Sequence, residues 1–221
     1  MHLESEYTKY PRTPHLPWSP GNTVDDIQLD SVTHLEKLTD VIVTEKLDGE
    51  NTTLYNDIMH ARSVDSRQHK SRNWLKSLHA SKMSDIPNGM RICGENMYAR
   101  HSIYYDQLKT YFYVFAIFDG DICLSWDETV EWCELLGFEI VPVLYRGPWV
   151  EDRIRACWTG ISRFGNEQEG YVVRNAFRFN QKDFRLNFAK YVRAGHVTSE
   201  EHWMDQPLVP NRLAFKPDRT Q

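Results

Sequence analysis

A lysine, an acid and a glycine occur together as Lys46-x-Asp48-Gly49, directly after the apolar run 41–43. That β-branched run predicts a strand with Lys46 at its end, and Gly49 allows the chain to turn back. Residues two apart share one face of a strand, so Lys46 and Asp48 are expected to point the same way. A lysine attacks only as the neutral amine, and lowering its pKa from about 10.4 to about 7.5 requires about 4 kcal/mol. Burial or a nearby cation, including a metal ion, can provide this bias.

Taken alone, the four-residue pattern fits a simpler interpretation, a solvated ion pair of Lys46 with Asp48 or Glu50. Two further acids make a chemical site the better interpretation. Glu95 and Glu169 each stand next to a glycine at an otherwise apolar strand. Acids flanked by apolar strand residues are seldom buried unless they have a partner or a function.

The elements that must position these residues are mostly short strands separated by turns. Strands are expected at 41–46, 51–55, 60–64, 90–98, 111–118, 121–124, 138–144, 169–174 and 184–192. Helices are expected at 31–38, 71–83, 127–136, 150–159 and 199–204. The helix at 127–136 is the best marked, because Ser125 and Glu128 form a capping box and Gly137 is a typical stop. Closely spaced strands joined by such turns predict an α+β fold of mixed, mostly antiparallel sheets with flanking helices.

Length and composition favour a single globular domain with an ordinary core. The chain has 221 residues, of which 41% are hydrophobic and 26% charged, and it has no apolar run of about 18 residues. The first residues lack the basic and apolar regions of a secretory signal, so a cytoplasmic protein is expected. The widely spaced cysteines are interpreted as reduced, buried thiols; they are Cys93, Cys123, Cys133 and Cys157. A net charge of −5 argues against a surface covered in basic residues, although a local groove for nucleic acid stays allowed.

Four prolines between residues 11 and 20 set the N-terminal region apart. Prolines so close together cannot continue a helix or a central strand, so residues 1–35 are expected to form an arm that packs on the domain. Arg12 and His15 in this arm could face a phosphate, but packing on the surface is the better interpretation.

Five strand-end patterns occur in the order and approximate spacing of the motifs of covalent nucleotidyltransferases. They are Lys46-x-Asp48-Gly49, Gly94-Glu95, Phe115, Glu169-Gly170 and Lys190. Over residues 41–193 the chain therefore resembles the ATP-dependent RNA ligases, in particular the RNA ligase 2 type of phage and related bacterial enzymes. The resemblance implies a nucleotidyltransferase (ATP-grasp-like ligase) fold, with an adenylyltransferase domain at 36–195 and a short helical tail at 196–221. Because the chain stops soon after these motifs, neither an oligonucleotide-binding domain nor a large C-terminal domain is expected.

The resemblance also implies a nucleophile and a nucleotide site. Lys46 would attack the α-phosphorus of ATP and keep AMP as a phosphoramidate, and Lys190 would contact the α-phosphate. Glu45 would contact the adenine amino group, and Phe115 would stack on the adenine ring. Further nucleotide contacts are implied for Asp48, Asn51, Arg62, Glu95 and Arg174.

Glu95 and Glu169 complete the implied site. Glu95 matches an acid that binds the ribose and organises the site, and Glu169 matches one that acts through hydrated Mg²⁺. Mg²⁺ prefers oxygen ligands and keeps several waters, which suits both glutamates as metal anchors through water. Phosphoryl transfer depends mainly on alignment and on neutralising oxygen charge, so lysine, arginine and a metal held by acids are the expected parts.

The sequence departs from the family pattern at three positions. Arg174 stands where many members have lysine, Ala116 replaces a commonly acidic residue, and Arg193 is displaced by its spacing. Two of the implied roles also have a structural alternative. Phe115 could be plain core, and Arg62 could pair with Asp65.

The expected function is ATP-dependent ligation of RNA, in which AMP passes from Lys46 to an RNA 5′-phosphate before a 3′-hydroxyl displaces it. The expected cofactors are ATP and Mg²⁺ or Mn²⁺, and the expected partner is RNA with 5′-phosphate and 3′-hydroxyl ends, without a membrane. A minimal DNA ligase and a GTP-using, capping-type guanylyltransferase are the enzymatic alternatives. A non-catalytic subunit that binds RNA ends and needs a protein partner for sealing is the alternative from another class.

Overall fold

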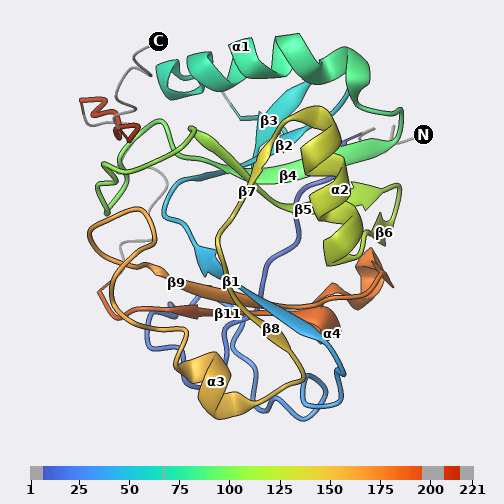
Figure 1. Cartoon of the computed structure of the whole chain (residues 1–221), viewed down its shortest axis with the longest axis vertical. Coiled ribbons are helices and arrows are strands. Elements are labelled where there is room, and N and C mark those ends of the chain that lie inside the picture. The colour runs from blue at the N-terminus through green and yellow to red at the C-terminus, as the bar shows by residue number, and fades with distance from the viewer. Residues whose placement is uncertain (1–6, 67, 196–206, 215–221) are drawn as a thin grey trace, which may run out of the picture.

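A computed structural model describes residues 7–66, 68–195 and 207–214 of the chain. Two β-sheets lie one above the other, with helices on their outer faces (Figure 1). Pairings between the named strands of the described residues are antiparallel, apart from the parallel pair of β5 (Phe112–Asp119) and β7 (Glu139–Ile140). The fold is therefore α+β with mostly antiparallel sheets, which confirms the prediction from the sequence.

The smaller sheet carries the lysine strand at its centre. Its strand order is β11 (Phe188–Val192), β9 (Gly170–Asn175), β1 (Val41–Lys46) and β8 (Val143–Gly147). Gly170 lies opposite Lys46 on one side and Val192 on the other. A Cβ at position 170 would lie 1.9 Å from the carbonyl oxygen of Tyr191, so only glycine lets β11 come this close to β9.

The larger sheet supplies the other wall of the site. Its order is β10 (Phe179–Asn180), β6 (Ile122–Cys123), β5, β4 (Met90–Asn96), β2 (Glu50–Leu54) and β3 (Met59–Ala61), with β7 beside β5. The apolar β5 lies inside this sheet, as its composition predicts. On the outer face, α1 (Asn73–Lys82) and α2 (Trp126–Leu136) bury Leu75, Cys133 and Leu136. The predicted capping box at Ser125 is present.

The other helices are short. They are α3 (Glu151–Arg155), α4 (Phe184–Asn187) and the 3-10 turns η1 (Lys70–Arg72), η2 (Met83–Asp85) and η3 (Gln181–Asp183). Figure 1 shows α3 and much of the N-terminal arm below the smaller sheet, where Leu16 and Val32 of the arm join the buried cluster around Val43 and Val173. The apolar face of the smaller sheet is thereby shielded from water.

Several predicted elements differ from the structure. Residues 31–38 form turns instead of a helix, because one turn already buries Val32 and Leu35. The strand predicted at 138–144 is divided at Pro142 into β7 and β8, which join different sheets. The start of the strand predicted at 184–192 is helical, which lets Phe184 stack on Phe188 at 4.5 Å. The helix predicted at 150–159 ends at Arg155, and the one predicted at 199–204 lies outside the described residues.

The four cysteines are buried and free, which confirms the prediction of reduced thiols. No helix within the described ranges is long and apolar enough to cross a membrane.

Candidate active site

Lys46 and Glu169 lie side by side where the end of β1 is next to the start of β9. Lys46 is the last residue of β1, and Glu169 directly precedes β9, in which Gly170 pairs with Lys46. The Lys46 Nζ atom lies 2.7 Å from both carboxylate oxygens of Glu169. The lysine side chain is 25% exposed, whereas that of Glu169 is 1% exposed. A buried carboxylate therefore holds an amine that solvent and ligands can still reach.

The charge state of Lys46 follows from its neighbours. Burial lowers the pKa of Lys46, but the carboxylates of Glu169 and Glu95 outweigh it, and the pKa stands above its usual value. Burial also raises the pKa of Glu169, against the opposing effect of Lys46. The protein's own side chains thus favour the ammonium form, so Lys46 has to lose a proton before it can act as a nucleophile.

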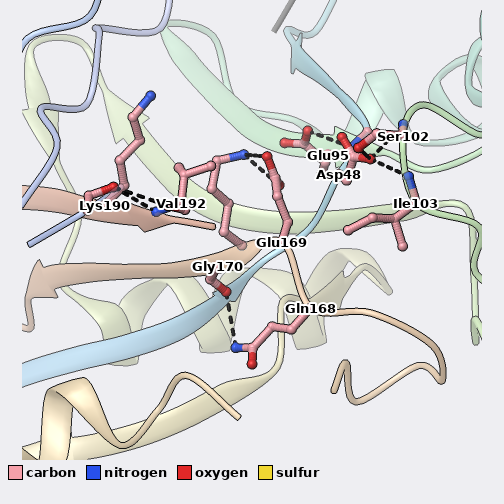
Figure 2. A network of polar contacts seen from close by, with 12 residues as sticks. Asp48, Glu95, Ser102, Ile103, Gln168, Glu169, Gly170, Lys190 and Val192 are labelled. Carbon is pink, nitrogen blue, oxygen red and sulfur yellow. Dashed lines mark hydrogen bonds and ion pairs between the residues drawn. The ribbon is translucent and has the colours of Figure 1, made fainter. Parts of the chain in front are cut away.

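Asp48 is engaged by backbone groups, not by Lys46. Its Oδ2 atom accepts from the N–H groups of Ser102, at 2.8 Å, and Ile103, at 2.7 Å, and from the Ser102 hydroxyl at 2.7 Å. The N–H of Asp48 donates to the Tyr105 hydroxyl at 3.1 Å. Asp48 therefore ties the turn after Lys46 to the loop at 97–111. Figure 2 shows the contacts of Asp48 with Ser102 and Ile103.

The solvated-ion-pair interpretation of Lys46 is wrong, because both acids that it invoked have other partners. Asp48 accepts from the loop at 97–111, and Glu50 forms a two-pronged ion pair with Arg72. The Lys46 ammonium pairs with Glu169 instead.

Glu95 lies on β4 next to this cluster (Figure 2). Its Oε1 atom accepts from the N–H of Gly49 at 3.2 Å, so the glycine of the lysine motif also holds the second acid. Burial raises the pKa of Glu95 to about 7, and Lys46 opposes this shift. Asn51 lies opposite Glu95 in the β2–β4 pair, and its buried Oδ1 atom has no hydrogen-bond partner among the described residues.

Glu45 carries an acceptor without a partner. Its side chain is 2% exposed, and Oε2 accepts from the N–H of Arg163 at 2.9 Å. Its Oε1 atom has no hydrogen-bond partner in the part of the chain that the structure describes. Buried acceptors are nearly always satisfied, so this oxygen indicates a donor that a ligand brings. An exocyclic amino group is such a donor, and the residue present therefore fits the adenine contact implied for it.

Lys190 and Phe115 both contact the N-terminal arm. The Lys190 Nζ atom lies 3.4 Å from Asp26 Oδ1, and Lys190 lies to one side of the Glu169 cluster in Figure 2. Burial, followed by the charge of Lys46, lowers the pKa of Lys190 to about 8. The ring of Phe115 is half-buried and meets the edge of Tyr10, with centroids 5.0 Å apart. Phe115 is thus partly core, with a remaining exposed portion that could meet a base.

Two of the predicted site residues are not brought to the cluster. Arg174 is 1% exposed, and its guanidinium donates to the carbonyl oxygens of Leu124, at 2.6 Å, and Phe115, at 3.3 Å. It joins the two sheets, so we leave it out of the proposed phosphate contacts. Arg62 is exposed after β3 and forms no ion pair with Asp65 within the described ranges.

The structure adds residues that the sequence did not single out. Ser102 and Tyr105 fix Asp48, and Asp26 faces Lys190. A search for acids near the proline-rich segment would have found Asp26, but no pattern marks the loop at 97–111. Among the described residues there is no group of three or more His, Cys, Asp or Glu suited to a metal ion. Glu95 and Glu169 therefore offer two carboxyl groups, which are hard oxygen donors, and not a complete set of metal ligands.

Comparison with known proteins gives a family and a fold. The model of the RNA ligase family matches residues 39–192. The RNA ligase of Naegleria gruberi with PPi is 21% identical, with a TM-score of 0.54 over 76% of this chain and 54% of that chain. A mutant of the same ligase with ATP and Mn is 22% identical, with a TM-score of 0.52 over 72% of this chain and 51% of that chain.

The chain thus spans about half of the length of those Naegleria ligases. A comparison with curated proteins gave no match. The family model covers most of the chain, and its limits enclose Lys46, Glu95, Glu169 and Lys190. This chain belongs to the RNA ligase family.

Proposed function

We propose that the protein is an ATP-dependent RNA ligase that joins a 5′-phosphate to a 3′-hydroxyl through a covalent lysyl-AMP. The observation that carries this proposal is the partly exposed Lys46 amine, 2.7 Å from the buried Glu169 carboxylate, in a chain of the RNA ligase family. A lysine held in this way is accessible to a nucleotide and has a proton acceptor beside it.

The side chains can perform the first step as follows. Lys46 Nζ attacks the α-phosphorus of ATP, the N–P bond forms, and the bond to the β-phosphate oxygen breaks to release pyrophosphate. Glu169, already in contact with the ammonium group, accepts the proton that Lys46 has to lose before the attack, and the second proton on the nitrogen passes to solvent as the phosphoramidate forms. Lys190 lies on the same face of the sheet as Lys46 and offers a second cation to the α-phosphate oxygens. AMP then passes to the RNA 5′-phosphate, and the 3′-hydroxyl displaces it.

Glu95 and Glu169 are the residues that would hold a divalent metal, through water. The two carboxyl groups place hard oxygen donors beside Lys46, which suits Mg²⁺ or Mn²⁺. Burial disfavours the charged form of both groups, and a bound cation would offset that effect. The metal would supply positive charge next to the phosphates. The Naegleria ligase structure with ATP and Mn supports this choice of cofactors.

The choice of ATP over GTP rests on Glu45. Its unpaired Oε1 atom can accept from the amino group of adenine. Guanine has a carbonyl oxygen at that position, and two acceptors facing each other in a buried site repel. Asp48, Asn51 and Phe115 are the further nucleotide contacts that we propose, and Arg62 is proposed for later steps.

The decisive experiment is to incubate the protein with Mg²⁺ and ATP labelled on the α-phosphate, and then to map the label by mass spectrometry. We expect label on Lys46 in the wild type and in Lys37→Ala, a control at an exposed lysine. We expect none in Lys46→Ala, and at least roughly tenfold less label from GTP.

Equal labelling of Lys46→Ala, or an unlabelled wild type, would overturn the proposal. Nicked RNA, nicked DNA and free RNA ends, supplied to the labelled protein, then identify the acceptor. Sealing of DNA in preference to RNA would favour the DNA ligase alternative. Binding of 5′-phosphate ends without turnover would favour the subunit alternative.

A further inference from the structure

The N-terminal arm is paired along β11, the edge strand of the smaller sheet. The N–H of Lys190 donates to the carbonyl oxygen of Pro14, and the N–H of Leu16 donates to the carbonyl oxygen of Lys190, both at 2.8 Å. Further along the arm, the N–H of Gly21 donates to the carbonyl oxygen of Val192 at 2.9 Å. Both backbone groups of Lys190 are therefore fixed by the arm.

The close approach of the arm depends on one glycine. A Cβ at position 21 would lie 2.3 Å from the carbonyl oxygen of Arg193, which leaves no room for a side chain. In the same stretch, the N–H of Val192 donates to the Ser19 hydroxyl at 2.9 Å. The arm thus runs alongside β11, and a single parallel bridge joins His15 to Lys190, the lysine that we place in the active site.

The same arm brings a carboxylate to that lysine. Asp26 Oδ1 lies 3.4 Å from Lys190 Nζ, and both side chains are about one-fifth exposed, at 21% and 19%. The other carboxylate oxygen accepts from the N–H of Thr23 at 3.1 Å and from its hydroxyl at 3.0 Å. His15 Nε2 lies 3.5 Å from that oxygen, and its Nδ1 contacts Ser19 at 2.8 Å. Other residues of the arm therefore hold the Asp26 carboxylate in place, and its second oxygen faces Lys190.

The two lysines of the site therefore have separate acidic partners. Glu169 contacts Lys46, and Asp26 contacts Lys190. Burial, and then the charge of Lys46, make the Lys190 ammonium harder to keep charged. The Asp26 carboxylate, 3.4 Å from the Lys190 Nζ atom, counteracts both effects. Phosphate binding needs the ammonium to be both charged and correctly placed.

We propose that Asp26 is a positioning residue for Lys190: the docked arm fixes the lysine's backbone by pairing with β11 and its ammonium by the Asp26 carboxylate, and lysyl-AMP formation depends on both. The inference rests on the proposed function. In this proposal the arm contributes to nucleotidyl transfer by holding Lys190, and not by contacting ATP.

The test compares rates of lysyl-AMP formation in single-turnover experiments over a range of ATP concentrations. We expect Asp26→Asn to be slower by roughly 10- to 100-fold, with a higher ATP concentration at half-maximal rate. Asp26→Glu keeps the carboxylate and should recover most of the rate. Asp25→Asn makes the same change at the adjacent, exposed acid and should match the wild type.

A double-mutant cycle separates positioning from a general loss of structure. If Asp26 acts through Lys190, then Asp26→Asn should have little further effect on rate in a Lys190→Ala background. Equal losses in both backgrounds would overturn the inference, as would equal rates for Asp26→Asn and Asp25→Asn. In both cases a labelled wild type leaves the proposed function standing. An unlabelled wild type would overturn the function and the inference together.

Discussion

At the scale of single residues, the site combines buried acids with cations that are only partly buried. Glu169 is 1% exposed and Lys46 is 25% exposed, so the carboxylate is fixed while the amine can meet a ligand. Glu45 is a further buried acid, and its Oε1 atom has no hydrogen-bond partner among the described residues. Buried polar groups without partners are costly in a folded protein, and they persist where a ligand completes them. These residues favour a site built for a bound nucleotide over a structural ion pair.

His15, which forms a bridge with Lys190, gives a prediction about pH. Burial, and then the charge of Lys190, lower its pKa from an ordinary 6.5 to about 4. Between these values the unfolded chain binds the proton more readily than the folded one. The contribution of neutral His15 is therefore fully present above about pH 6.5 and lost as the pH falls towards 4, by at most about 3 kcal/mol.

Urea unfolding of the wild type and of His15→Gln, at several values between pH 4.5 and 7.5, measures this contribution. We expect the stability advantage of the wild type to shrink as the pH falls. Because other titrating groups are the same in both proteins, their effects cancel in the difference. An advantage that stays constant over the whole range would contradict the assignment.

At the scale of elements, the ends of strands could be predicted, but the segments that support them could not. Apolar runs next to Lys46, Glu95 and Glu169 carry local information, because a strand's periodicity and a neighbouring glycine are visible in a few residues. The support for Asp48 comes instead from a loop, and that loop is held by Asn211, which is 106 positions from Tyr105. Such long-range pairing leaves no local pattern.

Asn211 illustrates what this support contributes to stability. It is 1% exposed; its amide donates to the carbonyl oxygen of Met97 at 2.8 Å, and its Oδ1 accepts from the N–H of Tyr105 at 2.9 Å. Asn211→Ala leaves these backbone groups unpaired, and we expect a loss of about 2–3 kcal/mol in the free energy of unfolding. Asn22→Ala, at an exposed asparagine, should lose less than about 0.5 kcal/mol. Similar urea midpoints for the two variants would show that the loop at 97–111 does not need Asn211.

At the scale of the whole molecule, two sheets have to stay in register for the site to exist. Lys46 and Lys190 belong to the smaller sheet, Glu169 directly precedes its strand β9, and Glu95 belongs to the larger sheet. Apolar side chains of both sheets join one buried cluster, in which Ile42 and Tyr113 take part, and the buried Arg174 also connects the two sheets. The family resemblance implied a nucleotide contact for Arg174, because a sequence shows an arginine at a strand end and not the carbonyl oxygens around it.

Arg174 therefore gives a prediction that separates stability from nucleotide binding. Its guanidinium contacts carbonyl oxygens of Leu124 and Phe115 and lies 5.3 Å from the centroid of the Phe188 ring, so truncation leaves a cavity and unpaired acceptors. We expect Arg174→Ala to lower the free energy of unfolding by about 3–5 kcal/mol. Arg178→Ala removes an exposed ion pair with Glu128 and should lose less than about 1 kcal/mol. At a temperature where Arg174→Ala is still folded, its half-maximal ATP concentration for lysyl-AMP formation should match the wild type. An increase in that concentration without a loss of stability would return Arg174 to the phosphate site.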